Sequence, residues 1–359
     1  QMCIRDRCFT AEWIEQVSSE LHYNDKNLIE KVIRALSLLE MLVKAGCPLV
    51  FKGGTALMLI LGKSAHRLSI DIDLICPPGT NIEDYLKSFA DFGFINLELV
   101  ERKQRDDADI PKSHSKFFYQ IAYRNDTDAQ SYILLDVLYE DIHYFRTQQI
   151  AINCPFIRLE GKPLMVTVPS AEDILGDKLT AFAPNTTGIP YYKNGRSCSM
   201  EIAKQLYDVG RLFENVSDLQ ITKEAFRKIA VVELSYRSFG TDIGQVFNDI
   251  RQTALCISTR GKAGEGDFDL IQDGIIRVKS FMYKQRYLID HAIIDAARAA
   301  YLATLIEKGI NEIESYSNNP ADIKDMVIRP SLPNKLNKLR SNLPEAYYYW
   351  AKTSELLEA

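Results

Sequence analysis

The stretch FKGGTALMLILGKSAHRLSIDIDLI, residues 51–75, decides the fold class of the chain. It joins a Gly-Gly turn, a short apolar run and a segment in which polar and apolar residues alternate. The apolar run predicts a helix, and the alternation with a period of two predicts a β-strand over 68–75. Side chains two residues apart on a strand point to the same side, so Ser69, Asp71 and Asp73 would share one face.

Two carboxylates close together on an apolar strand need neutralisation, because burying unpaired charge is costly. A hard divalent cation such as Mg2+, or Mn2+ in its place, would bind Asp71 and Asp73 and keep positions for water and phosphate. Ions held in this way support in-line phosphoryl or nucleotidyl transfer. The alternative is a polar strand face that meets solvent, with both aspartates as ordinary surface acids.

Two further features extend the pattern. Asp136 interrupts the apolar run YILLDVLYE, where an isolated carboxylate would be unfavourable, so we expect it to point to the same ion. An edge position in the sheet is the alternative. The turn at Gly53 and Gly54 precedes a helix start, whose backbone N–H groups could receive a phosphate. Taken alone, the two glycines indicate only a turn from strand to helix.

The order of predicted elements places the sheet in the first half of the chain. Helical periodicity covers residues 10–45, and nearly every segment after residue 170 is helical. The first half also contains a series of strand-like runs, which we expect to pair partly as antiparallel neighbours; they cover residues 48–52, 68–75, 93–103, 116–124, 131–140 and 164–170. The prediction is an α+β fold, with a mixed sheet and flanking helices in residues 1–168 and a mostly helical domain in residues 169–359.

Composition narrows the class of protein. A chain of 359 residues exceeds what one compact core usually serves, and 46% hydrophobic with 25% charged residues is typical of a globular protein. No run of 18 apolar residues predicts a membrane span. Seven scattered cysteines without CxxC spacing favour a reducing cytoplasm over a disulfide framework or zinc site. Residues 1–8 lack the apolar core of a signal peptide, and we treat them as a fragment or artefact outside the fold.

The motifs GGTAL, RLSIDIDL, VPSAEDILGDKLTAF and LYDVGRLF together resemble a known family. They are similar to the AbiEii/AbiGii-type nucleotidyltransferase toxins of bacterial abortive-infection toxin–antitoxin systems, within the polymerase-beta-like nucleotidyltransferase superfamily. The resemblance implies an enzyme of the EC 2.7.7 type that transfers a nucleoside monophosphate from a nucleoside triphosphate. It also implies tRNA or another RNA as acceptor, an antitoxin protein as partner, growth arrest as the outcome and a role in phage defence.

The resemblance also implies a role for each matching residue. Nucleotide binding falls to Gly53, Gly54, Thr55, Arg67, Ser69 and Lys178; metal binding to Asp71, Asp73 and Asp136; and catalysis to Asp71, Asp73, Lys178 and Asp208. Lys178 would bind the triphosphate, and Asp208 would act near the chemistry, as the base for the acceptor hydroxyl.

Helical spacing gives Lys178 and Asp208 ordinary alternatives. Lys178 interrupts an apolar stripe on its helix, where a surface lysine can lay its stem over apolar side chains. Asp208 lies off the apolar face of its own helix, beside Lys204 and Arg211, and salt bridges along the helix surface would explain it.

Two basic stretches could contact RNA. The first mixes aromatic and cationic residues, as single-stranded nucleic-acid sites do. The second lies within residues 326–344, which contain basic residues and no acid, as a surface for an RNA backbone would. Their members are Tyr191, Tyr192, Lys193 and Arg196, and Arg329, Lys335, Lys338 and Arg340. A solvent loop and a solvated helix face are the respective alternatives.

Two other functions stay open. The net charge of −5 favours a small-molecule acceptor over RNA, and a protein side chain is a related possibility. A nucleotide- or partner-binding module that has lost activity is the second alternative. The intact set of Asp71, Asp73, Asp136 and Lys178 argues against that module.

Overall fold

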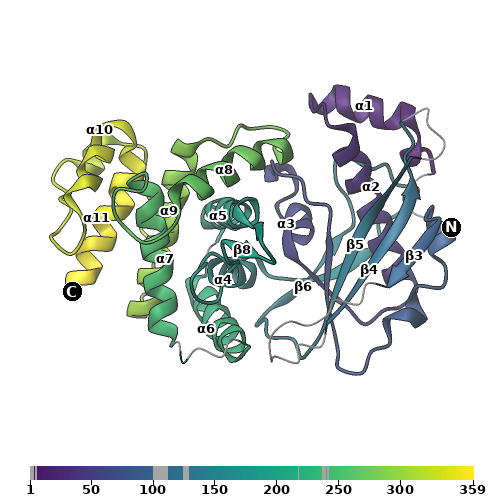
Figure 1. Ribbon diagram of the computed structural model, residues 1–359, viewed down its shortest axis with the longest axis horizontal. Helices are drawn as coiled ribbons and strands as arrows, with labels where there is room; N and C mark the ends of the chain where they lie inside the picture. The colour runs from purple at the N-terminus through teal and green to yellow at the C-terminus, as the bar shows by residue number, and fades with distance from the viewer. Residues whose placement is uncertain are drawn as a thin grey trace. The chain divides into compact units, whose positions relative to one another are not determined.

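The computed structural model describes residues 4, 6–99, 112–123, 129–216, 218–236, 240 and 242–359 (Figure 1). By its internal contacts the chain divides into two compact units. The first unit contains residues 1–170 and 280–286, and the second contains residues 171–279 and 287–359. The sequence pattern gave no sign that 280–286 returns to the first unit. No helix among the described residues is long and apolar enough to cross a membrane.

A five-stranded mixed sheet forms the centre of the first unit, as predicted (Figure 1). Its strand order is β1-β2-β5-β4-β3, so β5 and β4 lie in its interior. β2 and β5 pair in parallel, and the other neighbours are antiparallel. The strands are β1 (Val50–Lys52), β2 (Ile72–Cys76), β3 (Asn96–Leu99), β4 (Lys112–Gln120) and β5 (Gln130–Tyr139).

Helix α2 covers one face of this sheet, with its apolar stripe in a common core with alternate residues of β2, β4 and β5. Asp25 begins α2 by accepting a hydrogen bond from the Leu28 N–H, and Thr10 begins α1 in the same way with Trp13. The helices of this unit are α1 (Ala11–Leu21), α2 (Lys26–Lys44) and α3 (Gly53–Leu61). Short 3-10 helices span Asp6–Phe9, Gly62–Ser64, Ile82–Tyr85 and Phe89–Phe92.

The strand predicted over 68–75 is wrong at its start. β2 begins at Ile72, because the preceding segment pairs elsewhere: the Leu68 N–H donates to the Phe281 carbonyl at 2.8 Å, and the Tyr283 N–H donates to the His66 carbonyl at 3.0 Å. The partner segment comes from far along the chain, which a local pattern cannot reveal. Ser69 and Asp71 therefore lie outside the strand that carries Asp73.

Other strands differ in extent from their predictions. A separate two-stranded sheet pairs the predicted β7 (Met165–Pro169) with β6 (Thr147–Ala151), which the sequence pattern missed. β4 begins four residues earlier than predicted, at Lys112. Residues 100–103 and 124, at the ends of two predicted strands, lie outside the described residues.

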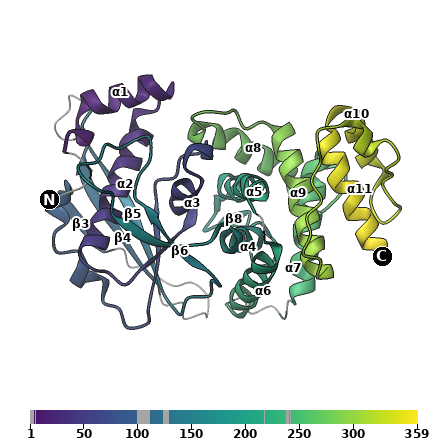
Figure 2. The same ribbon diagram turned by 180° about the vertical axis from the view of Figure 1, so that it is seen from behind.

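The second unit is helical, as predicted, with α9 packed against α5, α7 and α11 (Figure 2). A hairpin of β8 (Tyr192–Lys193) and β9 (Arg196–Ser197) turns at Asn194 and Gly195, whose positive φ angles of 52° and 73° suit a type I′ turn. The helices are α4 (Ala171–Ala181), α5 (Ser199–Phe213), α6 (Leu219–Ser235), α7 (Ile243–Ser258), α8 (Phe268–Val278), α9 (Ile289–Lys308), α10 (Leu339–Asn342) and α11 (Pro344–Glu358). Further 3-10 helices span Lys279–Phe281, Pro320–Ile323 and Asn334–Lys338.

Candidate active site

The glycine turn lies directly against the β2 aspartate. Gly53 opens α3 with a φ of +78°, a region that strains residues with a side chain. A Cβ atom on Gly53 would come 2.1 Å from Oδ2 of Asp73. Glycine is therefore required at this position both by its backbone angle and by the carboxylate beside it.

The second glycine makes room for two other predicted residues. A Cβ atom on Gly54 would lie 2.7 Å from Oγ of Ser69 and 3.0 Å from Nη2 of Arg67. The next residue, Thr55, donates its hydroxyl to the Asp71 carbonyl at 2.7 Å. The structure thus brings the turn, the residues before β2 and Asp73 together in the first unit.

The residue before α3 does not cap this helix with its side chain. In the part of the chain that the structure describes, Lys52 at the N-cap position makes no side-chain capping hydrogen bond to α3. Uncapped N–H groups in the first turn of a helix, together with the helix dipole, favour an anion. A phosphate group fits this chemistry.

Asp136 lies beside Asp73 in the sheet. The two residues are register partners on the parallel strands β5 and β2, whose axes are about 4.8 Å apart. Their neighbours Leu135 and Val137 are buried in the core, whereas the Asp136 side chain is 33% exposed. Asp136 is therefore neither a fully buried acid nor an edge residue: it lies on the face of a central strand opposite the core.

A histidine that the sequence analysis missed contacts this pair. His114 on β4 is the register partner of Asp136, and its Nδ1 lies 2.6 Å from Oδ1 of Asp136. The imidazole is 11% exposed. Because the strand was predicted to begin at residue 116, the alternation that would have placed His114 on the acidic face was not seen.

Lys31 is a second missed residue. It lies on α2, half-buried, where burial lowers the pKa of its ammonium group while the charges of Asp71 and Asp25 raise it. The Asp71 charge is thus close enough to act on Lys31. In the sequence, Lys31 looks like any polar position of an amphipathic helix.

The donor chemistry of the acidic pair fits a hard cation. Asp73 and Asp136 offer carboxylate oxygens from neighbouring strands, and such oxygens are the ligands that Mg2+ prefers. Within the described residues, no group of three His, Cys, Asp or Glu side chains is arranged to hold a metal ion. An ion held by this pair would take its remaining ligands from water and phosphate, as Mg2+ commonly does. The three-aspartate set that includes Asp71 stays a prediction.

Lys178 and Asp208 meet each other in the second unit. Nζ of Lys178 on α4 lies 3.1 Å from Oδ2 of Asp208 on α5, and the two side chains are 8% and 2% exposed. The surface alternatives for both residues are therefore wrong. Arg211 instead contacts Glu214 and Asp295. Asp208 is buried away from the apolar stripe because α4, α8 and α9 all pack on α5.

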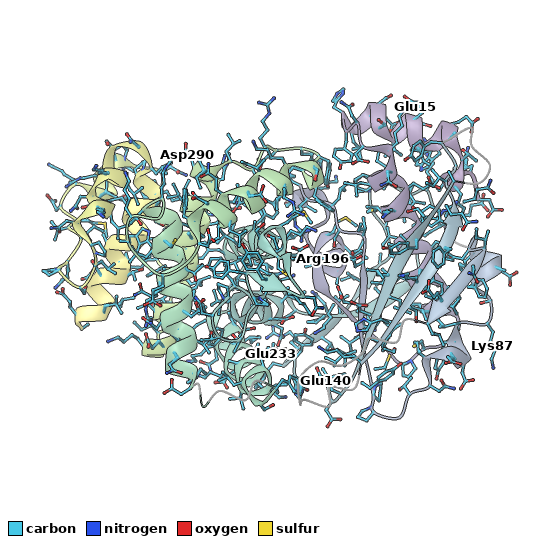
Figure 3. All side chains as sticks on the ribbon, viewed as in Figure 1. Glu15, Lys87, Glu140, Arg196, Glu233 and Asp290 are labelled. Carbon is cyan, nitrogen blue, oxygen red and sulfur yellow. The ribbon has the colours of Figure 1, made fainter. Side chains whose placement is uncertain are left out.

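The two basic stretches have different surroundings. Tyr192, Lys193 and Arg196 are exposed on the β8–β9 hairpin, whereas Tyr191 is only partly exposed. Arg196 is labelled in Figure 3. In the second stretch, cations bind other parts of the chain: Arg329 contacts Glu358 at 3.5 Å, Lys335 donates to the Lys262 carbonyl at 2.6 Å, and Arg340 donates to the Ile323 carbonyl at 3.0 Å. Lys338 is exposed. The second stretch is not one solvated helix face, since its regular structure is short.

Several solved structures are similar to this chain at low identity. JHP933 from Helicobacter pylori is 17% identical, with a TM-score of 0.42 over 78% of this chain and 94% of that chain. A putative nucleotidyltransferase from H. pylori is also 17% identical, with a TM-score of 0.39 over 79% and 94%. MenT4, a nucleotidyltransferase toxin from Mycobacterium tuberculosis H37Rv, is 11% identical, with a TM-score of 0.40 over 82% and 89%. No curated protein sequence matches the chain.

The sequence itself matches a protein family over residues 36–321, well over half of the chain. The family is described as "Nucleotidyl transferase AbiEii toxin, Type IV TA system". The match includes the glycine turn, both strands of the acidic pair and the Lys178–Asp208 pair, and it confirms the resemblance seen in the motifs. The chain therefore belongs to the AbiEii family of nucleotidyltransferase toxins of type IV toxin–antitoxin systems.

Proposed function

We propose that this transferase is Mg2+-dependent and moves a nucleoside monophosphate from a nucleoside triphosphate to an RNA acceptor, tRNA or another RNA. The observation that carries the proposal is the acidic pair: Asp73 and Asp136 are register partners, and Asp73 touches the glycine turn at the start of α3. Carboxylates for a cation and backbone donors for a phosphate thus lie next to each other.

Each residue has a defined part in this proposal. Asp73 and Asp136, with Asp71 nearby, would hold Mg2+, or Mn2+ in its place. When bound, the ion neutralises charge on the triphosphate and the departing pyrophosphate. The N–H groups at Gly53 and Gly54 would bind phosphate oxygens, and the contact with Asp73 fixes the turn against the acids. Catalysis would come mainly from positioning and charge stabilisation.

Arg67, Ser69 and Thr55 would support this site by holding the glycine turn and the segment before β2 in position. Ser69 and Arg67 fill the space that Gly54 leaves, and the Thr55 hydroxyl holds the Asp71 carbonyl. Substitution of these residues would move the turn relative to the acids, which reduces transfer without removing a ligand of the ion.

Lys178 and Asp208 enter the proposal through the family pattern. Lys178 would bind the triphosphate, and Asp208 would accept the proton of the acceptor hydroxyl. Their contact at 3.1 Å supports a shared role, because it fixes the position of the ammonium group.

The biological setting is part of the same proposal. The enzyme would act in the cytoplasm as the toxin of an abortive-infection system, arrest growth during phage attack, and be neutralised by a separately encoded antitoxin. Family membership supports the toxin and antitoxin roles in general.

A labelling experiment tests the proposal. The full chain is incubated with Mg2+, each α-labelled nucleoside triphosphate, and separate RNA, protein and metabolite fractions. We expect label on RNA, and a loss of roughly 10²–10³-fold in Asp73→Asn and Asp136→Asn, the size seen when one stabilising group is removed from an active site. Asp84→Asn is the matched control, since Asp84 is an exposed acid of the same unit.

Other outcomes identify the alternatives. Label on a metabolite or a protein would replace RNA as the acceptor. Nucleotide binding without transfer to any fraction would identify a binding module. Wild-type rates in both Asp73→Asn and Asp136→Asn would show that the acidic pair is not the metal site.

A further inference from the structure

An aromatic pair, one ring of which is exposed, lies on the same side of the sheet as the acidic pair. Tyr132 and Phe118 are register partners on β5 and β4, with ring centroids 5.7 Å apart. Tyr132 is 39% exposed, although β5 and β4 are interior strands of the sheet. Apolar side chains on interior strands are usually packed against other parts of the protein. An exposed ring at such a position is typical of a binding surface.

Two lysines flank the exposed ring. Nζ of Lys116 lies 5.4 Å from the centroid of the Tyr132 ring, and Nζ of Lys31 lies 5.6 Å from it. Lys116 is next to Phe118 on the same face of β4, and Lys31 reaches the ring from α2. Lys116 also contacts Glu98, but at 3.7 Å and with Glu98 half exposed, so this surface pair is weak.

The register fixes where this aromatic site lies relative to the acids. Tyr132 and Asp136 are four residues apart on one strand, which is about 13 Å. Leu134 lies between these two residues on β5 and pairs with Lys116 on β4. Asp136 pairs with His114. The face therefore runs from the acidic pair, past a basic residue, to an exposed ring.

We propose that Tyr132 and Phe118, flanked by Lys31 and Lys116, form a base-stacking subsite for single-stranded RNA, close to the end that accepts the nucleotide. The inference rests on the proposed function, because it names where the acceptor binds. Aromatic rings beside cations are the usual elements of single-strand recognition: the ring stacks on a base and the cations bind the backbone.

The two lysines favour RNA over the nucleoside triphosphate as the occupant. A nucleoside triphosphate has a single phosphate chain, which the acids and the glycine turn would already hold. The two lysines beside the ring would then need phosphates of their own, and an RNA strand supplies one at each nucleotide. If the base of the nucleoside triphosphate stacked on Tyr132 instead, it would use the ring, but it would bring no further phosphate for the two lysines.

Binding of a 12-nucleotide single-stranded RNA, labelled with a fluorophore at its 5′ end, tests the inference in the full chain without any nucleoside triphosphate. We expect Tyr132→Leu to weaken binding roughly tenfold and Tyr132→Phe to leave it unchanged, because the ring stacks and the hydroxyl does not. Lys31→Gln and Lys116→Gln should each reduce the slope of log affinity against log salt by about 0.7. Phe145→Leu is the matched control, since Phe145 is 60% exposed in the same unit.

Three results would overturn the inference. The first is unchanged RNA affinity in Tyr132→Leu, and the second is an equal loss in Phe145→Leu. The third is a rise in the KM for the nucleoside triphosphate in Tyr132→Leu with RNA affinity intact, which would place the nucleotide base on the ring. Thermal unfolding of each variant shows whether it is folded.

The binding test separates this inference from the proposed function. If RNA binds at Tyr132 but receives no label from any nucleoside triphosphate, the subsite stands and the proposed reaction fails. If Tyr132→Leu transfers label to RNA with the wild-type KM for RNA, the reaction stands and the subsite fails.

Discussion

The two groups of predicted site residues, one in each unit, differ in how their charge is balanced. In the first unit, Asp73 and Asp136 are like charges side by side on a sheet face, with one of them a third exposed. In the second unit, Lys178 and Asp208 are opposite charges in contact and almost fully buried. In the first group the two adjacent carboxylates carry like charges, whereas the second group contains its own counter-charge.

This difference predicts which substitutions lower stability as well as transfer. Removing one member of a buried ion pair leaves an uncompensated charge inside the protein, so stability falls. Removing one of two adjacent carboxylates takes away a ligand for the proposed cation and also relieves repulsion between like charges, so we expect transfer to change more than stability. Substitutions in the two units should therefore affect different measurements.

The largest expected effect concerns the buried pair. Lys178→Met should lower the free energy of unfolding by about 3–5 kcal/mol, because it leaves the Asp208 carboxylate buried without its lysine. The double variant Lys178→Met with Asp208→Asn should recover part of that loss. Urea denaturation of the single and double variants measures both values. If Lys178→Met unfolds like the wild type, the ion pair does not persist in solution.

A second prediction breaks the acidic pair without removing a carboxylate. In Gly53→Ala, the new methyl group would meet Oδ2 of Asp73 and push the carboxylate aside, so transfer should fall by roughly 10²-fold. Gly79→Ala is the matched control, because Gly79 has a similar φ of +83° with no atom within 4 Å of its Cβ position. Both variants carry the same backbone strain. Equal transfer rates in the two would show that the contact with Asp73 is unimportant.

The smallest expected effect concerns the pH dependence of stability. It tests whether a buried ion pair in the first unit affects the free energy of unfolding as the buried pair in the second unit does. Glu30 and Arg34 form a buried pair in the first unit, with Nη2 3.4 Å from Oε1. Burial raises the pKa of Glu30 above its ordinary value of 4.5, while the Ala122 N–H and Arg34 lower it. The folded protein therefore binds more protons than the unfolded chain from about pH 4.5 upwards, and stability falls as pH rises through that window.

Glu30→Gln tests this pH dependence. The free energy of unfolding of the wild type, relative to Glu30→Gln, should fall as pH rises above 4.5 and then level off, because the folded protein holds the Glu30 proton to higher pH than the unfolded chain does. Glu12→Gln, at an exposed position of α1, is the control. A difference that rises with pH would mean that Arg34 outweighs burial at Glu30.

The sequence predicted the features that depend on local pattern. The apolar run YILLDVLYE predicted β5, and the glycine turn predicted the start of α3, so the elements around Asp73 and Asp136 were found. The pairing of Asp73 with Asp136 depends on register between distant strands, which no local pattern encodes. His114 was missed because the strand was predicted to begin after it, and Lys31 because its place on α2 looks like any polar position of an amphipathic helix.

Burial of Asp208 could not be predicted either. Helical periodicity identifies one apolar face, and Asp208 lies outside it. On α5 the other faces are also covered by neighbouring helices, and only the tertiary arrangement shows this. The family pattern was the one signal in the sequence that marked Asp208.

The return of residues 280–286 to the first unit has a consequence for synthesis. Tyr283 hydrogen bonds through its hydroxyl to the Ala65 carbonyl, 218 residues earlier in the chain, and Met282 pairs with Arg67. The ribosome makes the chain from its N-terminus. The segment that contains Arg67 can therefore pair with residues 280–286 only after most of the second unit has been made. Nascent chains that end before residue 280 would lack these contacts, so the segment before β2 would reach its final arrangement only late in translation.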